Sequence, residues 1–168
     1  MTKFVKFAAL AAVALAATPA LAAPVGVTGA PPSATARIIK PLTLTATGAL
    51  DFDTIVMNGV TADRTVTVND DATITCDTEL VCAATGTVPT YTVTGTQGQQ
   101  VNIIKNGSTL NGSNGGTLTL TPVGAASITL TNSGATGDDF TIGGSIVIGA
   151  ATVDGVYTGT VDVEVDYN

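Results

Sequence analysis

The sequence contains no histidine, the side chain that most often acts as a general base or a metal ligand near neutral pH. Without it, neither a Ser-His-Asp triad nor a Cys-His pair can form. A serine–lysine pair would have to use Lys40 or Lys105, and Lys105 lies next to an expected turn, where a solvated lysine is the simpler interpretation. We therefore expect a protein that is not an enzyme and that has no cofactor.

Long apolar runs are also missing. The N-terminal run Phe7–Ala17 is too short to span a bilayer, and no later segment is apolar enough to do so. Lys3 and Lys6 precede this run, and the small-x-small triplet Ala20-Leu21-Ala22 follows it, an order typical of a cleaved secretory signal peptide; an uncleaved amphipathic anchor is the alternative. We expect a signal peptide of residues 1–22, an N-terminal extension of residues 23–33 and one domain of residues 34–168.

Basic and aromatic residues are scarce. The mature chain keeps four basic residues against thirteen carboxylates, a net side-chain charge of −9. An acidic chain without a basic patch argues against nucleic acid and anionic membrane surfaces as partners. The few aromatic rings disfavour a sugar-stacking platform and predict a mostly aliphatic core; in the mature chain they are Phe52, Tyr91, Phe140, Tyr157 and Tyr167.

The remaining composition is that of an all-β protein. Threonine and valine dominate, no segment of the mature chain has helical periodicity, and Asn-Gly and Asp-Gly turn signals recur at short intervals. Many short strands joined by frequent turns favour a β-sandwich. The expected strands are Ile38–Ala46, Leu50–Val56, Arg64–Val68, Ala72–Cys76, Thr90–Thr94, Gln100–Lys105, Thr117–Thr121, Ser127–Thr131, Ser145–Ile148 and Val156–Tyr167.

Cys76 and Cys82 are the only cysteines of this exported chain. In an oxidising compartment they most simply form a disulfide, which would stabilise the fold by about 2 kcal/mol in the loop-entropy model. A redox pair or a zinc site is the alternative, but two thiols without histidine make a poor zinc site.

Three pairs of carboxylates invite a search for a metal site. Asp51 and Asp53 flank Phe52 on an expected strand, so both should face water while Phe52 packs inward. The other two pairs, Asp70/Asp71 and Asp138/Asp139, lie in expected turns, where aspartate is favoured for local hydrogen bonds. Calcium could bind there, but none of the pairs matches a spaced acidic loop, so we expect no metal.

The last fourteen residues, Gly155–Asn168, alternate most regularly. From Tyr157 onward, apolar residues and glycine occupy the odd positions and polar residues the even positions, the pattern of a strand with one buried face. An amphipathic strand at an open end of a chain can pair with another chain along its free edge.

The sequence resembles, in the segments Arg37–Leu44, Leu50–Ile55, Ile142–Ile148 and Gly155–Tyr167, the bacterial domain-of-unknown-function 4402 family. One departure is Asp53, where that family usually has glycine, and it puts the local turn in question. The family is similar to spore-coat-U-like and fimbrial-subunit adhesin folds. This resemblance implies an immunoglobulin-like, pilin-type Greek-key sandwich, exported through the periplasm to the bacterial cell surface by a chaperone–usher route.

Fimbrial subunits that bind periplasmic chaperones typically end in an alternating strand with a penultimate aromatic residue and a glycine near its start. Here these positions are Tyr167 and Gly155. The resemblance implies a sandwich that lacks one strand, and its partners would be a periplasmic chaperone, an outer-membrane usher and neighbouring copies of this chain or related subunits. The residues expected to line the groove and dock the chaperone are Gly155, Tyr157, Val161, Val163, Val165 and Tyr167.

The extension of residues 23–33 supplies a candidate donor strand, because Val25, Val27 and Gly29 alternate along it. A flexible leader is an equally open interpretation, and a register with Ala34, Ala36 and Ile38 is a further option. We expect a structural subunit of a fimbria-like filament. The alternatives are a monomeric binding module that recognises a glycan or surface partner through its Asn/Gly-rich loops, such as Asn106–Gly116, and a coat protein that fills its own groove.

Overall fold

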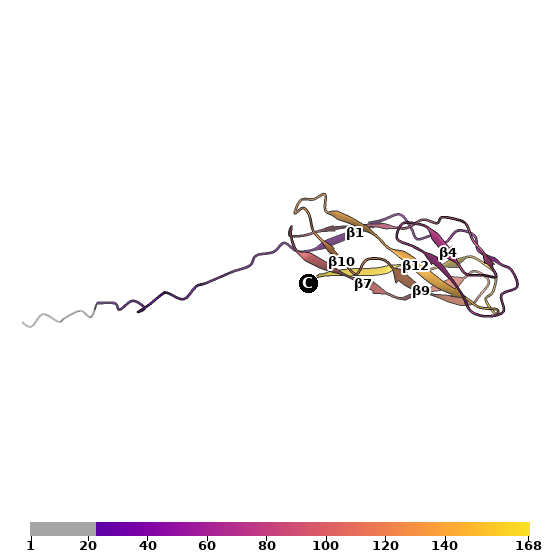
Figure 1. Cartoon of the computed structure of the whole chain (residues 1–168), viewed down its shortest axis with the longest axis horizontal. Coiled ribbons are helices and arrows are strands. Elements are labelled where there is room, and N and C mark those ends of the chain that lie inside the picture. The colour runs from indigo at the N-terminus through magenta and orange to yellow at the C-terminus, as the bar shows by residue number, and fades with distance from the viewer. Residues whose placement is uncertain (1–22) are drawn as a thin grey trace, which may run out of the picture. The chain divides into compact units, whose positions relative to one another are not determined.

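A computed structural model describes residues 23–168, and the expected signal peptide lies outside the described residues. The chain divides into two units, Met1–Ala36 and Arg37–Asn168. Residues 23–36 of the first unit form neither helix nor strand, and every regular element of the second unit is a β-strand (Figure 1). No helix among the described residues has the length and apolar character needed to cross a membrane.

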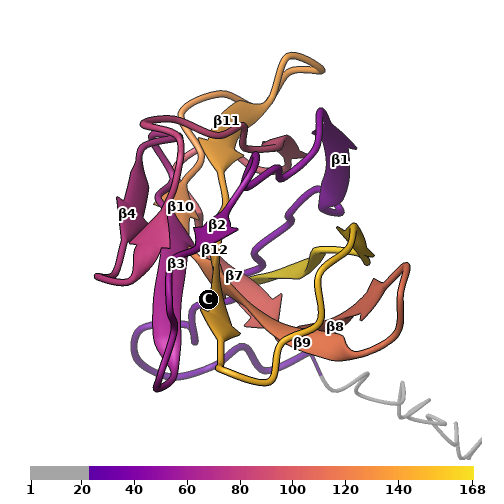
Figure 2. The ribbon, with the colours of Figure 1, turned by 90° about the vertical axis from the view of Figure 1, so that its right-hand side faces the viewer.

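The second unit is an all-β sandwich of antiparallel sheets, as predicted (Figure 2). The largest sheet has the strand order β13-β8-β9-β12-β3-β4. Its strands are β3 (Arg64–Val68), β4 (Ile74–Cys76), β8 (Ser108–Gly112), β9 (Thr117–Val123), β12 (Gly143–Ile148) and β13 (Tyr157–Thr158).

Three smaller sheets, β1-β6-β11, β10-β7-β14 and β2-β5, complete the sandwich. Their strands are β1 (Thr43–Thr47), β2 (Val56–Met57), β5 (Leu80–Val81), β6 (Thr90–Thr94), β7 (Gln100–Asn106), β10 (Ser127–Thr129), β11 (Asp138–Thr141) and β14 (Asp162–Tyr167).

The C-terminal segment pairs first with β8 and then with β7, and the register changes between the two pairings. The C-terminal segment pairs with β7 through Asp162 and Asn106, and with β8 through Thr158 and Asn111. Between these two pairs the C-terminal segment advances four residues while the β7–β8 segment advances five. The extra residue is a bulge on the β7–β8 side, and bulges bend a strand. The segment predicted as one strand, Val156–Tyr167, is therefore divided into β13 and β14.

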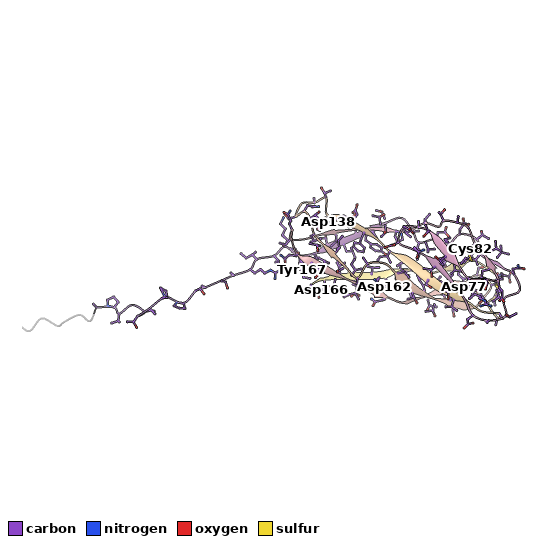
Figure 3. All side chains as sticks on the ribbon, in the orientation of Figure 1. Asp77, Cys82, Asp138, Asp162, Asp166 and Tyr167 are labelled. Carbon is purple, nitrogen blue, oxygen red and sulfur yellow. A yellow bond between two sulfur atoms is a disulfide. The ribbon has the colours of Figure 1, made fainter. Side chains whose placement is uncertain are left out.

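The core has two parts, which lie toward opposite ends of the sandwich. Figure 3 shows Cys82 at one end and Tyr167 at the other. The disulfide-side core consists of Val66, Leu80, Leu110, Leu118, Leu120, Ile146 and Ile148, with both cysteines packed against it. The tyrosine-side core consists of Tyr91, Val93, Val101, Ile103, Leu130 and Ile142, with Tyr167 packed against it. Apart from Tyr91, the buried residues that make up these two cores are all aliphatic, as the composition predicts.

Several strand boundaries differ from those predicted. The first strand starts at Thr43 rather than Ile38, because Pro41 has no amide proton for a ladder and the amide of Lys40 donates instead to Oγ1 of Thr96 at 2.7 Å. The Asn/Gly-rich segment 106–116, predicted as a loop, contains strand β8. Asp138 and Asp139, predicted in a turn, lie in β11, where Asp139 accepts a hydrogen bond from Thr92 across the sheet at 2.6 Å.

The expected strand Leu50–Val56 is mostly irregular, and only Asp51 pairs with Thr87 before β2 begins. Its irregularity centres on Asp53, whose φ of 56° lies in the left-handed region. Aspartate tolerates this region better than most residues because its short side chain can bind the local backbone. The Oδ1 atoms of Asp51 and Asp53 accept hydrogen bonds from the amides of Asp53 and Thr54, at 2.8 and 2.6 Å. Asp53 therefore forms the turn at the position where the resembling family usually has glycine.

Candidate functional site

A groove of about 770 Å³ opens over the disulfide-side core. Its two walls are the segments 49–57 and 152–161, which are far apart in the sequence. These segments contribute nine and ten residues to the lining, whereas a typical β-strand has about five or six residues. Each wall therefore contains at least as many residues as a short strand. The floor consists of Leu110, Leu118, Leu120, Ile146 and Ile148.

The floor is apolar because alternate residues of three strands point inward. In β9, Leu118 and Leu120 are 7% and 2% exposed, while the threonines that alternate with them are exposed. Ile146 and Ile148 do the same in β12, with 4% exposure each. The floor residues are nearly covered even though the groove is open, so part of the cover must come from its walls.

The wall formed by segment 49–57 supplies this cover. Leu50, Phe52 and Ile55 are partly buried and pack against the disulfide-side core. A Cβ atom added to Gly144, on β12, would lie 2.7 Å from both Leu50 and Leu120, so glycine leaves the space that Leu50 fills. Phe52 packs inward and the two aspartates beside it are exposed, as the alternation predicts.

Apolar side chains remain exposed around the mouth of the groove. Val156 is 69% exposed, Val56 52%, Val153 40% and Met57 38%, and all four line the groove. These exposed side chains enlarge the apolar area that an occupant of the groove could cover.

The groove is also bordered by strands with a free edge. Within the described residues, β13 pairs only with β8, and β2 pairs only with β5. A free edge presents unpaired amide and carbonyl groups to which another strand can add. The groove thus combines an apolar floor with the unpaired backbone amides and carbonyls of the edge strands β2 and β13.

The predicted groove residues fall into two sets. Gly155, Tyr157 and Val161 line the groove, and the Tyr157 hydroxyl donates to the carbonyl oxygen of Val153 at 2.7 Å. Val163 and Val165 lie further along the same segment and pack against the tyrosine-side core, outside the groove lining.

Tyr167, the penultimate residue, also lies outside the groove lining and turns inward. Its ring packs against Val93, Val101 and Leu130. Its hydroxyl donates to the carbonyl oxygen of Lys40 at 2.7 Å and accepts from the amide of Thr96 at 2.9 Å. The C-terminal end of β14 is therefore tied to the start of the domain.

The candidate donor residues belong to the other unit. Val25 and Val27 are 92% and 70% exposed, and Gly29 has a φ of 100°. No residue from 23 to 36 is in a strand. The apolar side chains of these two valines are therefore exposed.

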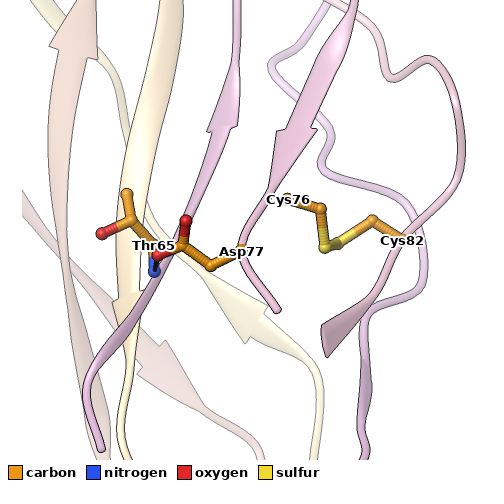
Figure 4. The surroundings of a disulfide bond; sticks show 4 residues. All are labelled: Thr65, Cys76, Asp77 and Cys82. Atoms are coloured by element: carbon orange, nitrogen blue, oxygen red, sulfur yellow. Dashed lines mark hydrogen bonds between the residues drawn. A yellow bond between two sulfur atoms is a disulfide. The ribbon is translucent and has the colours of Figure 1, made fainter. Parts of the chain in front are cut away.

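The structure contains the predicted disulfide between Cys76 and Cys82, with a Cα–Cα distance of 6.2 Å (Figure 4). The short loop that it closes is fixed to β3 at two points. Asp77 accepts a hydrogen bond from the amide of Thr65 at 2.8 Å, and Glu79 forms an ion pair with Arg64 at 2.9 Å. The hydrogen bond from Arg64, followed by that from the Thr61 amide, lowers the pKa of Glu79. The arrangement stabilises the fold at the disulfide end and has the geometry of a structural crosslink.

In the part of the chain that the structure describes, no three cysteine or carboxylate side chains gather as a metal site would require. Asp71 binds Thr73, and Asp138 accepts hydrogen bonds from the hydroxyl and amide of Thr131. These bonds lower the pKa of both carboxyl groups. Each of these carboxylates therefore has a local structural role.

The groove was only partly visible in the sequence. The Thr-Leu alternation of residues 117–121 predicts that Leu118 and Leu120 face a core, but nothing local places them beneath segment 49–57. Alternation predicts that Phe52 packs inward, but no local pattern predicts that Phe52 and Leu50 cover this particular floor. The C-terminal wall was predicted because its alternation is regular.

Comparison with known proteins supplies the family. No curated protein and no solved structure matched the chain. A family model described as Domain of unknown function (DUF4402) matches residues 42–167, which include all fourteen strands and both walls of the groove. The chain belongs to this family.

Proposed function

We propose that the mature protein is a non-enzymatic structural subunit of a fimbria-like surface filament, assembled by strand complementation. In this proposal the groove receives an apolar β-strand, and residues 23–33 supply it. A periplasmic chaperone and an outer-membrane usher would handle the subunit before assembly. The observation that carries the proposal is the groove itself, with its apolar floor and a short edge strand, β2 or β13, in each wall.

The physical argument concerns two kinds of unsatisfied groups. The exposed valines and Met57 around the mouth leave apolar surface in water, and each square ångström covered is worth about 25 cal/mol. The free edges of β2 and β13 leave backbone groups without strand partners. A β-strand satisfies both at once, because its side chains fill the groove while its amides and carbonyls pair with the walls.

The extension has the composition that such a strand needs. Residues 23–36 have no charged side chain, and Val25, Val27 and Gly29 alternate with small or polar residues. Pro24 and Pro31 bracket this set, and the intervening residues, 25–30, all have amide protons. Six residues are a typical strand length, and the walls are long enough for them.

The sharpest test compares two substitutions that add the same charge to neighbouring positions. Val27→Asp places a carboxylate on the side expected to face the floor, whereas Thr28→Asp places it on the opposite side. We expect Val27→Asp to abolish SDS-resistant ladders and filaments of the mature chain, and Thr28→Asp to retain them. Deletion of residues 23–33 should have the same effect as Val27→Asp. Ladders that persist after the deletion would refute the donor assignment.

A monomeric secreted binding module is the second candidate, and one observation favours it. Every floor residue is at most 8% exposed in the single chain, so the domain has little core to protect by assembly. Such a module would remain monomeric in size-exclusion chromatography at every concentration. The segment 106–116, from which recognition would come, is partly occupied by β8, so the turn at residues 113–116 is the part left for it.

A further inference from the structure

The groove has a rim of one charge. Its charged lining residues are Asp51, Asp53 and Asp154, and it has no lysine or arginine in its lining. All three aspartates are exposed. The one ion pair found among residues 23–168 joins Arg64 to Glu79, so none of the rim carboxylates has a cationic partner there. The apolar floor is therefore bordered by three aspartates that have no cationic partner among the described residues.

Charge is distributed unevenly along the chain. Residues 23–50 contain no carboxylate, but they contain Arg37 and Lys40. All thirteen carboxylates lie between residues 51 and 166. Three of the four basic residues of the mature chain are engaged within the domain, since Arg64 pairs with Glu79, Nζ of Lys105 donates to the carbonyl oxygens of Gly124 and Ala125, and Nζ of Lys40 donates to the carbonyl oxygen of Ser133. Arg37 is exposed and directly follows residues 23–36, which have no charged side chain.

We infer that the negative rim selects the occupant of the groove by charge, and that the selected occupant is residues 23–33 of a second copy of this chain. That segment has no carboxylate, and the positive charges next to it are the α-amino group that signal-peptide cleavage leaves at residue 23 and Arg37, four residues beyond its end. The inference rests on the proposed function and adds the criterion by which the groove accepts one strand and rejects others. An acidic strand, such as β14 of another copy with its carboxylates at residues 162, 164 and 166, is excluded by the same rim.

Mutual repulsion of the domains strengthens this selection. Two mature chains, each with a net side-chain charge of −9, repel one another in most orientations. An approach that directs the N-terminal region of one copy toward the rim of the other replaces repulsion by attraction. Complementary charge of this kind chiefly accelerates association and suppresses wrong partners. The rim therefore acts on the rate and orientation of encounter, while the apolar floor holds the strand.

Asp154 is the residue to vary. The carboxylates of Asp51 and Asp53 bind backbone amides of the wall, so their replacement would also alter the turn. The side chain of Asp154 forms no hydrogen bond within the described residues, and only its carbonyl oxygen is engaged, by Asn114. Asp70 is the matched control, because it is exposed, has no side-chain hydrogen bond in the same part of the chain, and lies outside the groove lining.

The experiment measures self-association of the full mature chain by light scattering at low and high ionic strength. At about 0.01 M, charges act over about 30 Å, and at about 1 M over only about 3 Å. We expect Asp154→Lys to slow association about tenfold at low ionic strength and to have little effect at high ionic strength. Asp70→Lys makes the same change in net charge away from the rim, so it should accelerate association by reducing repulsion. The two substitutions are therefore expected to act in opposite directions.

A charge exchange tests the assignment of Arg37. Arg37→Glu should slow association, and its combination with Asp154→Lys should restore most of the rate. Its combination with Asp70→Lys, which has the same net charge, should not. The inference is overturned if Asp154→Lys accelerates association as Asp70→Lys does, or if both combinations behave alike. If Val27→Asp blocks assembly while the charge variants do not differ, strand docking stands and charge selection fails. If the mature chain does not self-associate at any ionic strength, the proposed function itself fails.

Discussion

The hydroxyl of Tyr167 donates a 2.7 Å hydrogen bond to the carbonyl oxygen of Lys40, which joins the penultimate residue to a residue just before the first strand. Lys40 is held at two further points, through its amide to Oγ1 of Thr96 and through Nζ to the carbonyl oxygen of Ser133, both at 2.7 Å. The start and the end of the domain are thus fixed at the same place, and the extension begins beyond this point.

We expect Tyr167→Phe to lower the free energy of unfolding by about 1–2 kcal/mol, because it leaves the Thr96 amide and the Lys40 carbonyl without this partner. Urea unfolding followed by circular dichroism measures the change. Tyr157→Phe is the matched control, since its hydroxyl binds only one exposed carbonyl oxygen and its loss should cost less. Equal effects of the two substitutions would contradict a special role for the Tyr167 hydroxyl.

Removal of the disulfide should lower stability by about 2 kcal/mol, because the unfolded chain regains the freedom that the closed loop removes. The comparison is between the wild-type protein with and without a reductant and the double variant Cys76→Ser/Cys82→Ser. We expect reduction of the wild type to reproduce the stability of the variant, and the variant to be insensitive to the reductant. A variant as stable as the oxidised protein would show that the crosslink contributes nothing.

Gly159→Ala should destabilise the domain by about 1–3 kcal/mol, since the new methyl group would lie 2.6 Å from Leu110 and 2.7 Å from the carbonyl oxygen of Thr109. The backbone atom cannot move aside as a side chain can, so the segment between β13 and β14 must shift. Thermal unfolding gives the measurement. Gly26→Ala is the control, because no atom lies within 4 Å of its added Cβ and its melting temperature should not change.

Stability should fall in acid through carboxylates whose pKa is lowered in the folded protein. Hydrogen bonds from Arg64 lower the pKa of Glu79, and the Thr131 hydroxyl lowers that of Asp138. A lowered pKa contributes stability that is complete above the pKa of the unfolded chain, about 4, and is lost as the pH falls through the lower folded value. Urea midpoints should therefore decrease below about pH 4, and Glu79→Gln should make this decrease shallower. A midpoint that rises in acid would contradict the sign.

The strongest sequence patterns located their strands well. Arg64–Val68 and Thr90–Thr94 were predicted with the bounds that the structure has, because strict alternation and flanking turns leave one register. The break in the C-terminal strand could not be read in the same way, since the extra residue that causes it lies on β7–β8, far away in the sequence. Strand β8 was hidden by its asparagines and glycines, which favour turns when taken alone.

The candidate site could be predicted on one side only. The regular alternation of residues 157–167 identified one wall, but the other wall depends on the left-handed conformation of Asp53, and both Leu50 and Phe52 had been expected in a strand. The inward position of Tyr167 is a contact across 127 residues, for which no local pattern exists.

The bond between Lys40 and Tyr167 also determines how the domain would carry tension. A pull on the N-terminal extension reaches the domain at Lys40, close to the end of β14. From there the chain carries the load into the ladder between β1 and β6, which pair from Thr43 to Thr47, and the Tyr167 hydrogen bond links this point to β14. Tension directed along this ladder shears its hydrogen bonds together rather than opening them one at a time. A domain loaded in this way resists extension through its sheet, and its core is not the first part to yield.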